Sequence, residues 1–424
     1  MFLPQLQACL VTTILISLSL TWRADSHDPA VIAAPRSKLE SRYSSSTLSR
    51  FLPFSNVSPN MPPWKNAPRV LFKLDGDDQL YNTTMDTGST GLLVSASDMA
   101  DYDPETASRY PKGWQYYSSS NKLSSGNWIP KKISFIEANV TATVPVLAVT
   151  ASVICPWYKE SDGSSCPTSP NGTSAVPTPM PTHIRYMGVG FGREYNHQPQ
   201  GTPDKVSLIN IDSIDEKPLK DGCIADGSEC LNEGYIIHDA GVTIGLTAEN
   251  TKGFRFVKLA LNHSWTDDPR DWTQTAGCIS LNGVPCQNST LLLDTGISRA
   301  YLTLPPSVPM DVVEAPSKSH PDRPVLKLTD GQNITVYFGS EEPYIYGYQF
   351  TTGDKEDELV PDQVTVTKSD QKQPYINTGR HFYRGFDVLY DPIGGYLGIR
   401  KKDTTERSML HEDRGQMVVN QADH

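Results

Sequence analysis

Met85-Asp-Thr-Gly-Ser-Thr-Gly-Leu-Leu-Val-Ser95 recurs in outline at Leu293-Asp-Thr-Gly-Ile-Ser-Arg-Ala-Tyr-Leu-Thr303. In each stretch a strand-like run leads into Asp-Thr-Gly, and a short link then leads to a second apolar run. The two aspartates, Asp86 and Asp294, lie about 200 residues apart, which is close to the length of one medium domain. The repetition therefore predicts two related lobes, each of which contributes one aspartate.

Two aspartates brought together suit hydrolysis by an activated water molecule. If one carboxyl group is ionised and the other protonated, the first takes a proton from water while the second donates its proton to the carbonyl under attack. Like charges at close range do not ionise together readily, so the pair shares a proton and titrates as a unit. The two motifs thus predict hydrolysis of peptide bonds by Asp86 and Asp294, without a metal or a cofactor.

The residues that follow each aspartate fit this arrangement. Gly88 and Gly296 permit tight backbone geometry and a close approach of the two loops. Thr87 and Thr295 are expected to extend their hydroxyls to the opposite loop and so to hold the aspartates in place. Because threonine is β-branched, these side chains also have few rotamers.

These features resemble the pepsin-like aspartic proteases, since two Asp-Thr-Gly motifs at this spacing are far more specific than one. Arg185-Tyr-Met-Gly-Val-Gly-Phe-Gly192 is similar to a family segment that packs beneath the first active-site loop. Gly379-Arg-His-Phe-Tyr-Arg-Gly-Phe-Asp-Val-Leu-Tyr-Asp391 and Gly395-Tyr-Leu-Gly-Ile399 resemble the closing strands of the family. The resemblance covers roughly residues 67–400 and implies a mostly-β, bilobal pepsin-like acid protease fold with a central cleft.

The resemblance also implies roles for single residues. Asp86 and Asp294 would form the catalytic pair, and Ser89 would hydrogen-bond the outer oxygen of Asp86. Tyr117, or its neighbour Tyr116, would be the tyrosine of a flap that closes over the substrate. The implied protein is a secreted aspartic endopeptidase that acts at acidic pH on a peptide or protein substrate.

Several positions depart from the family pattern. Ile297 stands where the family usually has a hydroxyl residue, so Asp294 is expected to lack one hydrogen bond and the proton affinity of the pair should rise. The flap carries Tyr-Tyr-Ser-Ser-Ser-Asn where the family shows Tyr-Gly, and Asn377 and Thr378 replace an apolar pair before Gly379. The departures leave a second hypothesis open, in which a catalytically silent protein of this fold binds a protein or glycan partner.

The order of segments along the chain predicts an exported, mostly-β protein. The expected segments are a signal peptide (1–24), a linker or short pro-segment (25–66), an N-terminal lobe (67–235), a C-terminal lobe (236–400) and a disordered tail (401–424). Order is expected to begin near Val70. Short β-rich runs bounded by turn residues predict strands, among them 69–74, 142–149, 241–246 and 363–367.

The cysteines and the sequons agree with secretion. Cys9 lies in the expected signal peptide, and the other six cysteines fall in three close pairs that predict the disulfides Cys155–Cys166, Cys223–Cys230 and Cys278–Cys286. Seven Asn-x-Ser/Thr sequons predict glycosylation of several sites, at Asn56, Asn82, Asn139, Asn171, Asn262, Asn288 and Asn333. The sequons alone support a third hypothesis, a structural extracellular glycoprotein.

Charge and hydropathy narrow the range of partners. The formal net charge is −11, and we find no basic run with interleaved aromatic residues, so we expect no nucleic-acid partner. The apolar run within residues 6–22 is short and rich in Ser and Thr, and no later segment has the roughly 18 apolar residues of a membrane span. We therefore expect a monomer that is secreted and makes no stable membrane insertion.

Overall fold

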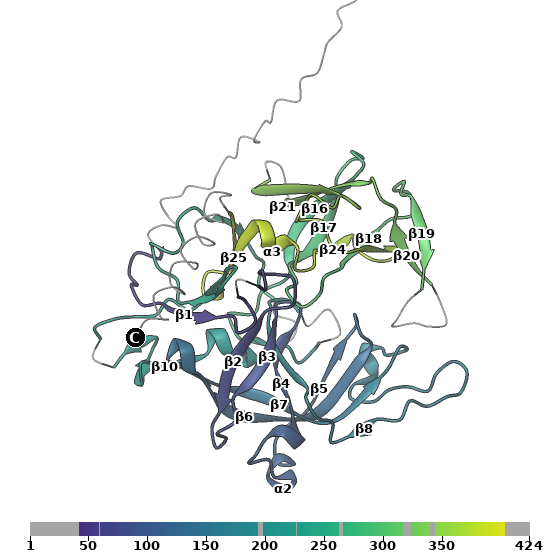
Figure 1. The fold of residues 1–424 in the computed structure, drawn as a ribbon. Coiled ribbons are helices and arrows are strands. Elements are labelled where there is room, and N and C mark those ends of the chain that lie inside the picture. Colours follow the sequence, from purple (N-terminus) through teal and green to yellow (C-terminus); the bar gives the residue numbers. More distant parts are fainter. Residues whose placement is uncertain are drawn as a thin grey trace, which may run out of the picture.

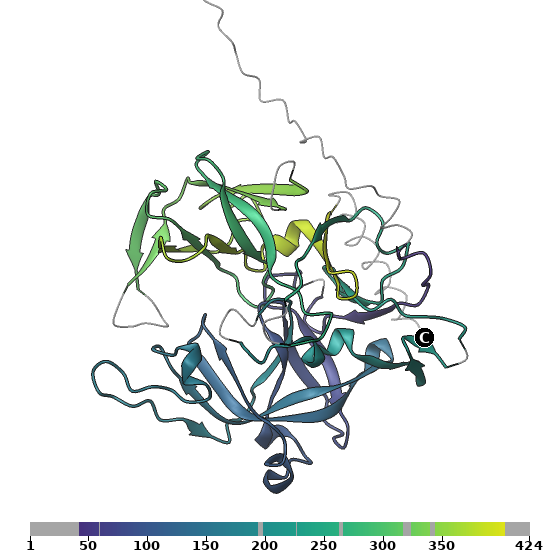
Figure 2. The same cartoon turned by 180° about the vertical axis from the view of Figure 1, so that it is seen from behind.

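The computed structural model describes residues 42–402, apart from 59, 194–197, 226, 263–265, 317–323 and 340–343. The protein is mostly β within this range, as the sequence predicted, and its strands form three sheets. Figures 1 and 2 show the strands of an eleven-stranded sheet at one end of the molecule and those of a nine-stranded sheet at the other. The expected signal peptide (1–24) and the expected tail beyond Lys402 lie outside the described residues.

The eleven-stranded sheet contains the first Asp-Thr-Gly motif. Its strands in spatial order are β12 (Cys223–Ile224), β11 (Lys217–Lys220), β10 (Ile211–Ile214), β7 (Val140–Ile154), β4 (Thr90–Ser95), β9 (Arg185–Val189), β3 (Tyr81–Asp86), β2 (Arg69–Leu74), β6 (Lys122–Phe135) and β5 (Lys112–Tyr117), and β8 (Thr178–Pro179) pairs with β7. The two longest strands, β6 and β7, also pair with each other and bend the sheet back on itself. Residues on β2 alternate between buried and half-buried positions, which is the period of a strand with one face in the core.

The nine-stranded sheet contains the second motif. Its strands in spatial order are β19 (Val312–Ala315), β20 (Val325–Leu328), β23 (Val364–Lys368), β18 (Ala300–Leu304), β24 (Tyr375–Asn377), β17 (Gln287–Leu292), β16 (Thr275–Leu281), β21 (Asn333–Phe338) and β22 (Tyr346–Thr351). The helices among the described residues are short. They are α2 (Pro104–Ala107), α3 (Phe382–Gly385) and the 3-10 turns η1 (Ala96–Asp98), η2 (Ile136–Ala138), η3 (Glu160–Asp162), η4 (Pro203–Lys205) and η5 (Ser207–Ile209).

The six-stranded sheet joins distant parts of the chain. Its strands in spatial order are β1 (Arg50–Pro53), β14 (Gly241–Ile244), β13 (Tyr235–Ile237), β25 (Phe386–Asp391), β26 (Tyr396–Lys401) and β15 (Arg255–Lys258). The expected boundary between the lobes, at residues 235 and 236, falls inside β13. The expected disordered tail begins at 401, but Lys401 is the last residue of β26. Lys402 forms an ion pair with Asp239.

The expectation that order begins near Val70 is wrong. Strand β1 pairs along its whole length with β14, well before that residue. Leu48, Leu52, Phe54 and Trp64 are all at most 5% exposed, so this segment contributes to the hydrophobic core. The abundance of Ser, Pro and Asn between these apolar residues obscured the strand in the sequence. Residues 42–66 are therefore part of the fold where they are described, and the role of a pro-segment stays a prediction.

The two Asp-Thr-Gly motifs lie in equivalent strand arrangements. After the first motif, β9 pairs parallel with β3 and antiparallel with β4, while β4 pairs parallel with β7. After the second motif, β24 pairs parallel with β17 and antiparallel with β18, while β18 pairs parallel with β23. The internal repetition seen in the sequence is therefore also a repetition of topology, and it places both aspartates at the same point of the repeat.

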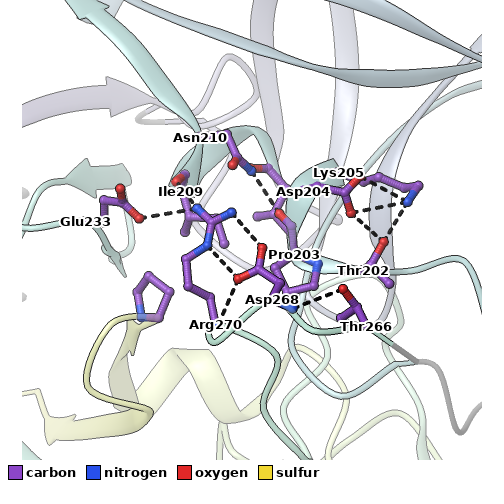
Figure 3. Close-up of polar contacts among 12 residues, drawn as sticks. Thr202, Pro203, Asp204, Lys205, Ile209, Asn210, Glu233, Thr266, Asp268 and Arg270 are labelled. Atoms are coloured by element: carbon purple, nitrogen blue, oxygen red, sulfur yellow. Dashed lines mark hydrogen bonds and ion pairs between the residues drawn. The ribbon is translucent and has the colours of Figure 1, made fainter. Parts of the chain in front are cut away.

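A polar network connects segments outside the strands (Figure 3). The Arg270 guanidinium donates two hydrogen bonds to the Asp268 carboxylate, at 2.8 and 3.0 Å, and one to the carbonyl of Ile209 at 3.1 Å. It also lies 3.3 Å from the carboxylate of Glu233, whose pKa is raised by burial and partly lowered again by Arg270. The network therefore connects the segments that precede β10, β13 and β16, and these three strands belong to three different sheets.

The structure has the three disulfides that the sequence predicted. The Cα atoms are 5.7 Å apart in Cys155–Cys166, 3.9 Å apart in Cys223–Cys230 and 5.6 Å apart in Cys278–Cys286. Each bridge closes a short loop, as expected for cysteines that are near neighbours in the chain. In the part of the chain that the structure describes, no helix has the length and apolar character to cross a membrane.

Candidate active site

The two aspartates end buried strands at corresponding places. Asp86 is the last residue of β3, and Asp294 comes two residues after β17. The preceding residues, Met85 and Leu293, are 0% and 3% exposed, so each strand delivers its aspartate from within the core. The aspartates themselves are 8% and 6% exposed. A carboxyl group buried to this degree needs hydrogen-bond partners.

Asp86 receives its hydrogen bonds from its own loop. The backbone N–H of Gly88 donates to Oδ1 at 2.8 Å, and the Ser89 hydroxyl donates to Oδ2 at 2.7 Å. The bond from Ser89 is the one that the sequence predicted. Because Ser89 is fully buried, this contact fixes the orientation of the carboxyl plane.

Asp294 obtains the equivalent bonds from two different segments. The N–H of Gly296 donates to Oδ1 at 2.8 Å, while the Asn377 side-chain amide donates to Oδ2 at 2.6 Å. Ile297 supplies no hydroxyl, as the sequence indicated, but Asn377 on β24 provides a donor that the sequence analysis did not foresee. Asn377, which also departs from the family pattern, therefore provides Asp294 with the kind of hydrogen bond that Ile297 cannot make.

Thr87 and Thr295 connect the two motif loops. The Thr87 hydroxyl donates to the carbonyl of Leu293 at 2.6 Å and accepts from the N–H of Thr295 at 3.0 Å. The Thr295 hydroxyl donates to the carbonyl of Met85 at 2.9 Å and accepts from the N–H of Thr87 at 3.0 Å. Both threonines are 0% exposed. The structure thus has the crossed hydroxyls expected from the sequence, and we call these two residues the threonine pair.

Gly88 and Gly296 bring the two carboxyl groups close together. A Cβ on Gly88 would lie 2.4 Å from Oδ2 of Asp294, a separation that real side chains do not show. A Cβ on Gly296 would lie 2.6 Å from Oδ1 of Asp86 and 3.2 Å from Oδ1 of Asp294. Oδ1 of Asp86 and Oδ1 of Asp294 are therefore no farther apart than the sum of these two distances. Only glycine fits at either position, which agrees with the expectation of closely approaching loops.

The proximity of the carboxyl groups changes the protonation of Asp294. Burial and the negative charge of Asp86 together raise the pKa of Asp294 to about 7. Hydrogen bonds from Asn377 and Gly296 and the positive charge of Arg193 act in the opposite direction but are weaker. Asp294 consequently keeps its proton at acidic pH, while carboxyl groups this close titrate as a pair.

The structure distinguishes between the two candidate flap tyrosines. Tyr117 ends β5 and lines the groove above the aspartates, and the charge of Asp86 adds to the effect of burial in raising the pKa of Tyr117. Tyr116 points to the other face of the hairpin, where its ring stacks on Tyr158 at 4.3 Å. Its hydroxyl donates to Asn121 at 2.9 Å. Tyr116 therefore belongs to a separate hydrophobic cluster, and only Tyr117 faces the groove.

The two tyrosines are expected to respond differently to loss of the hydroxyl. Tyr116→Phe should lower the free energy of unfolding by about 1 kcal/mol, because it removes a buried hydrogen bond. Tyr117→Phe should change it by less than about 0.5 kcal/mol, since the Tyr117 hydroxyl interacts with Ser89 but makes no hydrogen bond of normal geometry with a described residue. Urea unfolding of the two variants measures this contrast, and equal losses would contradict the assignment of the two side chains.

A groove of about 1060 Å³ runs over the aspartates. Strands from both the eleven-stranded and the nine-stranded sheets line it, together with the Ser118–Ser120 turn that follows Tyr117. Asp86, Asp294, Gly88, Gly296 and Tyr117 all face this space, whereas the threonine pair lies beneath it. Among the described residues, no three His, Cys, Asp or Glu side chains gather closely enough to hold a metal ion.

Sequence reasoning missed several residues of this groove, and two of them, Asn377 and Arg193, contact the motif loops. Asn377 was noted only as a departure before Gly379, and Arg193 was not considered, although it directly follows the glycine-rich segment that ends at Gly192. The Arg193 side chain donates to the carbonyl of Gly88 at 2.7 Å and is 6% exposed. Its position one residue after that segment is the only local signal that could have found it.

Comparison with known proteins adds no further identification. The sequence matches no protein-family model and no curated protein.

Proposed function

We propose that the protein is an aspartic-type hydrolase, which cleaves peptide bonds with a water molecule activated between Asp86 and Asp294. The threonine pair supports this most directly, because it crosses the two motif loops beneath two buried carboxyl groups that open on one groove. Within that class, the proposal is a divergent pepsin-like aspartic protease with two related lobes and the groove as its substrate cleft. The equivalent strand arrangements around the two motifs support this finer assignment.

The proposed reaction uses one proton on the pair. Asp86 takes a proton from water as the water oxygen bonds to the carbonyl carbon, and Asp294 donates its proton to the carbonyl oxygen. The tetrahedral product then breaks its C–N bond, the proton on Asp86 passes to the leaving amine, and Asp294 recovers a proton from the hydroxyl group. Asp294 suits the role of proton donor because its pKa of about 7 keeps it protonated in acid.

We also propose that the protein is secreted. The three disulfides favour an oxidising compartment, where such bridges form and persist. The apolar N-terminal residues and the sequons point the same way.

The test is cleavage of labelled casein and of a mixed peptide library between pH 3 and 8. The full chain is produced through a secretory host as wild type, Asp86→Asn, Asp294→Asn and the exposed control Asp370→Asn. We expect wild type and Asp370→Asn to cleave at acidic pH, and both motif variants to fall to background. The wild-type rate should decline as pH rises through about 7, because Asp294 then loses the proton that it must donate.

Equal background rates in all four proteins would exclude the hydrolase. That result would favour a catalytically silent protein that binds a partner in the same groove, and capture of a partner by wild type and both motif variants alike would support it.

A further inference from the structure

We propose that the groove selects peptides with an acidic side chain next to the scissile bond, and that Arg193 is the residue that recognises it. This inference rests on the proposed hydrolase function and names its substrate class. Five charged side chains line the groove among the described residues, and two of them are the aspartates of the candidate site. The other three, Lys122, Arg193 and Lys372, are all cationic, although the whole chain is acidic.

Arg193 is a buried cation that makes no ion pair with any described residue, although its charge acts on Asp294. It is 6% exposed, and no carboxylate of a described residue lies within ion-pair distance of its guanidinium. Buried charges in proteins are normally paired, because removing a charge from water is costly. Its Nη1 has no acceptor among the residues that the structure describes, although the side chain lines the groove. Among the described residues, no carboxylate pairs with this arginine, so it could pair with an anion of a bound peptide.

A second unpaired donor lines the same groove. The Nε2 of Gln274 is also buried without an acceptor in the described part of the chain, and Gln274 also lines the groove. Gln274 packs against the residue before Arg193, because a Cβ on Gly192 would lie 2.5 Å from the backbone nitrogen of Gln274 and 3.1 Å from its Cγ. A carboxylate has two oxygens that accept hydrogen bonds, so one carboxylate held between these two side chains would satisfy both donors.

The position of Arg193 sets which substrate residue it would contact. Its Nε donates to the carbonyl of Gly88 at 2.7 Å, and the N–H of Gly88 holds Asp86. Its charge also reaches Asp294 and the hydroxyl of Tyr375, whose pKa is raised by burial to about 12 and is lowered in part by Arg193. Arg193 is therefore fixed next to the aspartates, and its ligand would adjoin the bond that they attack.

The test compares matched peptides that differ only in charge. Cleavage sites in the peptide library, mapped by mass spectrometry with wild type, supply one sequence that is then synthesised with Glu or Gln beside the scissile bond. We expect about a tenfold preference for Glu at pH 6, which corresponds to one hydrogen bond to a charged group. The preference should vanish near pH 3, where glutamate is protonated and resembles glutamine.

Variants assign the preference to Arg193. Arg193→Gln should cleave the two peptides equally at pH 6, Arg193→Lys should keep part of the preference, and the exposed control Lys217→Gln should behave as wild type. Equal cleavage of both peptides by wild type at pH 6 would overturn the inference, and that comparison holds even if Arg193→Gln fails to fold.

If the protein is not a hydrolase, a binding measurement tests the role of Arg193 instead. If wild type cleaves no peptide, anisotropy at pH 6 measures the binding of one fluorescent casein-derived peptide that is synthesised with either Glu or Gln at its centre. Tighter binding of the Glu peptide would then support recognition by Arg193 without hydrolysis, and equal binding would overturn it.

Discussion

The Thr87→Val, Thr295→Val double variant is expected to lose most of the stability of the fold around the motif loops. Each substitution keeps the shape of the side chain but removes a hydroxyl that both donates to and accepts from the opposite loop. Thr87→Val would leave the Leu293 carbonyl with only a 3.3 Å bond from Tyr383, and the Thr295 N–H with none. A buried group without its partner costs about 1–3 kcal/mol, and each single variant affects two such groups, so each should lose about 2–6 kcal/mol.

The double-mutant cycle tests whether the two threonines act together. Their hydroxyls lie 3.5 Å apart in one connected network, so the two losses should not add. Urea unfolding of both single variants and the double variant measures this coupling. Thr83→Val is the matched control, because Thr83 is equally buried on β3 but its hydroxyl has only a 3.5 Å contact with the adjacent carbonyl. If the double variant and the wild type unfold at the same urea concentration, the crossed hydrogen bonds do not stabilise the loops.

The stability of the wild-type protein should fall as pH rises from about 4 to about 7. The pKa of Asp294 is about 7 in the fold and 3.8 as its ordinary value, so the folded state binds this proton more tightly than the unfolded chain does. The stabilisation is therefore complete below the lower value and is lost as pH rises through the upper one. Because a tenfold change in proton affinity is about 1.4 kcal/mol, the loss is on the order of 4 kcal/mol.

Asp294→Asn removes this titration and isolates its contribution. We expect the free energy of unfolding of the variant to exceed that of wild type increasingly between pH 4 and pH 7, as measured by urea unfolding at each pH. Asp387→Asn is an opposite control: burial opposes ionisation of Asp387, but the hydrogen bond from His238 and the charge of Lys402 lower its pKa to about 2. That variant should lose stability above about pH 4, where the wild-type carboxylate is charged and paired. Parallel pH profiles for wild type and Asp294→Asn would contradict the raised pKa.

These stability predictions do not depend on hydrolysis. They follow from hydrogen bonds and burial at the two motif loops, and would hold equally for a protein that only binds a partner in the groove. Stability and cleavage measurements on Asp294→Asn therefore address different claims: the first concerns the environment of the carboxyl group, and the second concerns its chemistry.

Local sequence was sufficient for features encoded within short segments. Strand periodicity predicted β2, β14, the middle of β7 and most of β23, and cysteine spacing predicted the three disulfides. The repeated motif identified both aspartates and their crossed threonines, because the residue types that the arrangement requires are adjacent in the chain. The strand at Arg50–Pro53 was missed, since only its pairing with β14 distinguishes it from a polar linker.

The remaining features of the site depend on contacts between segments far apart in the sequence. Tyr116 and Tyr117 are adjacent on one strand and point to opposite faces, so the choice between them requires knowing which face of the hairpin covers the aspartates. Asn377 contacts Asp294 only because β24 pairs with β17 in one particular register. Arg193 faces the groove because the segment after β9 passes Gly88. Sequence alone thus determined which groups are present, while the docking of the sheets decided which of them meet, because strand register and packing set distances that no local pattern encodes.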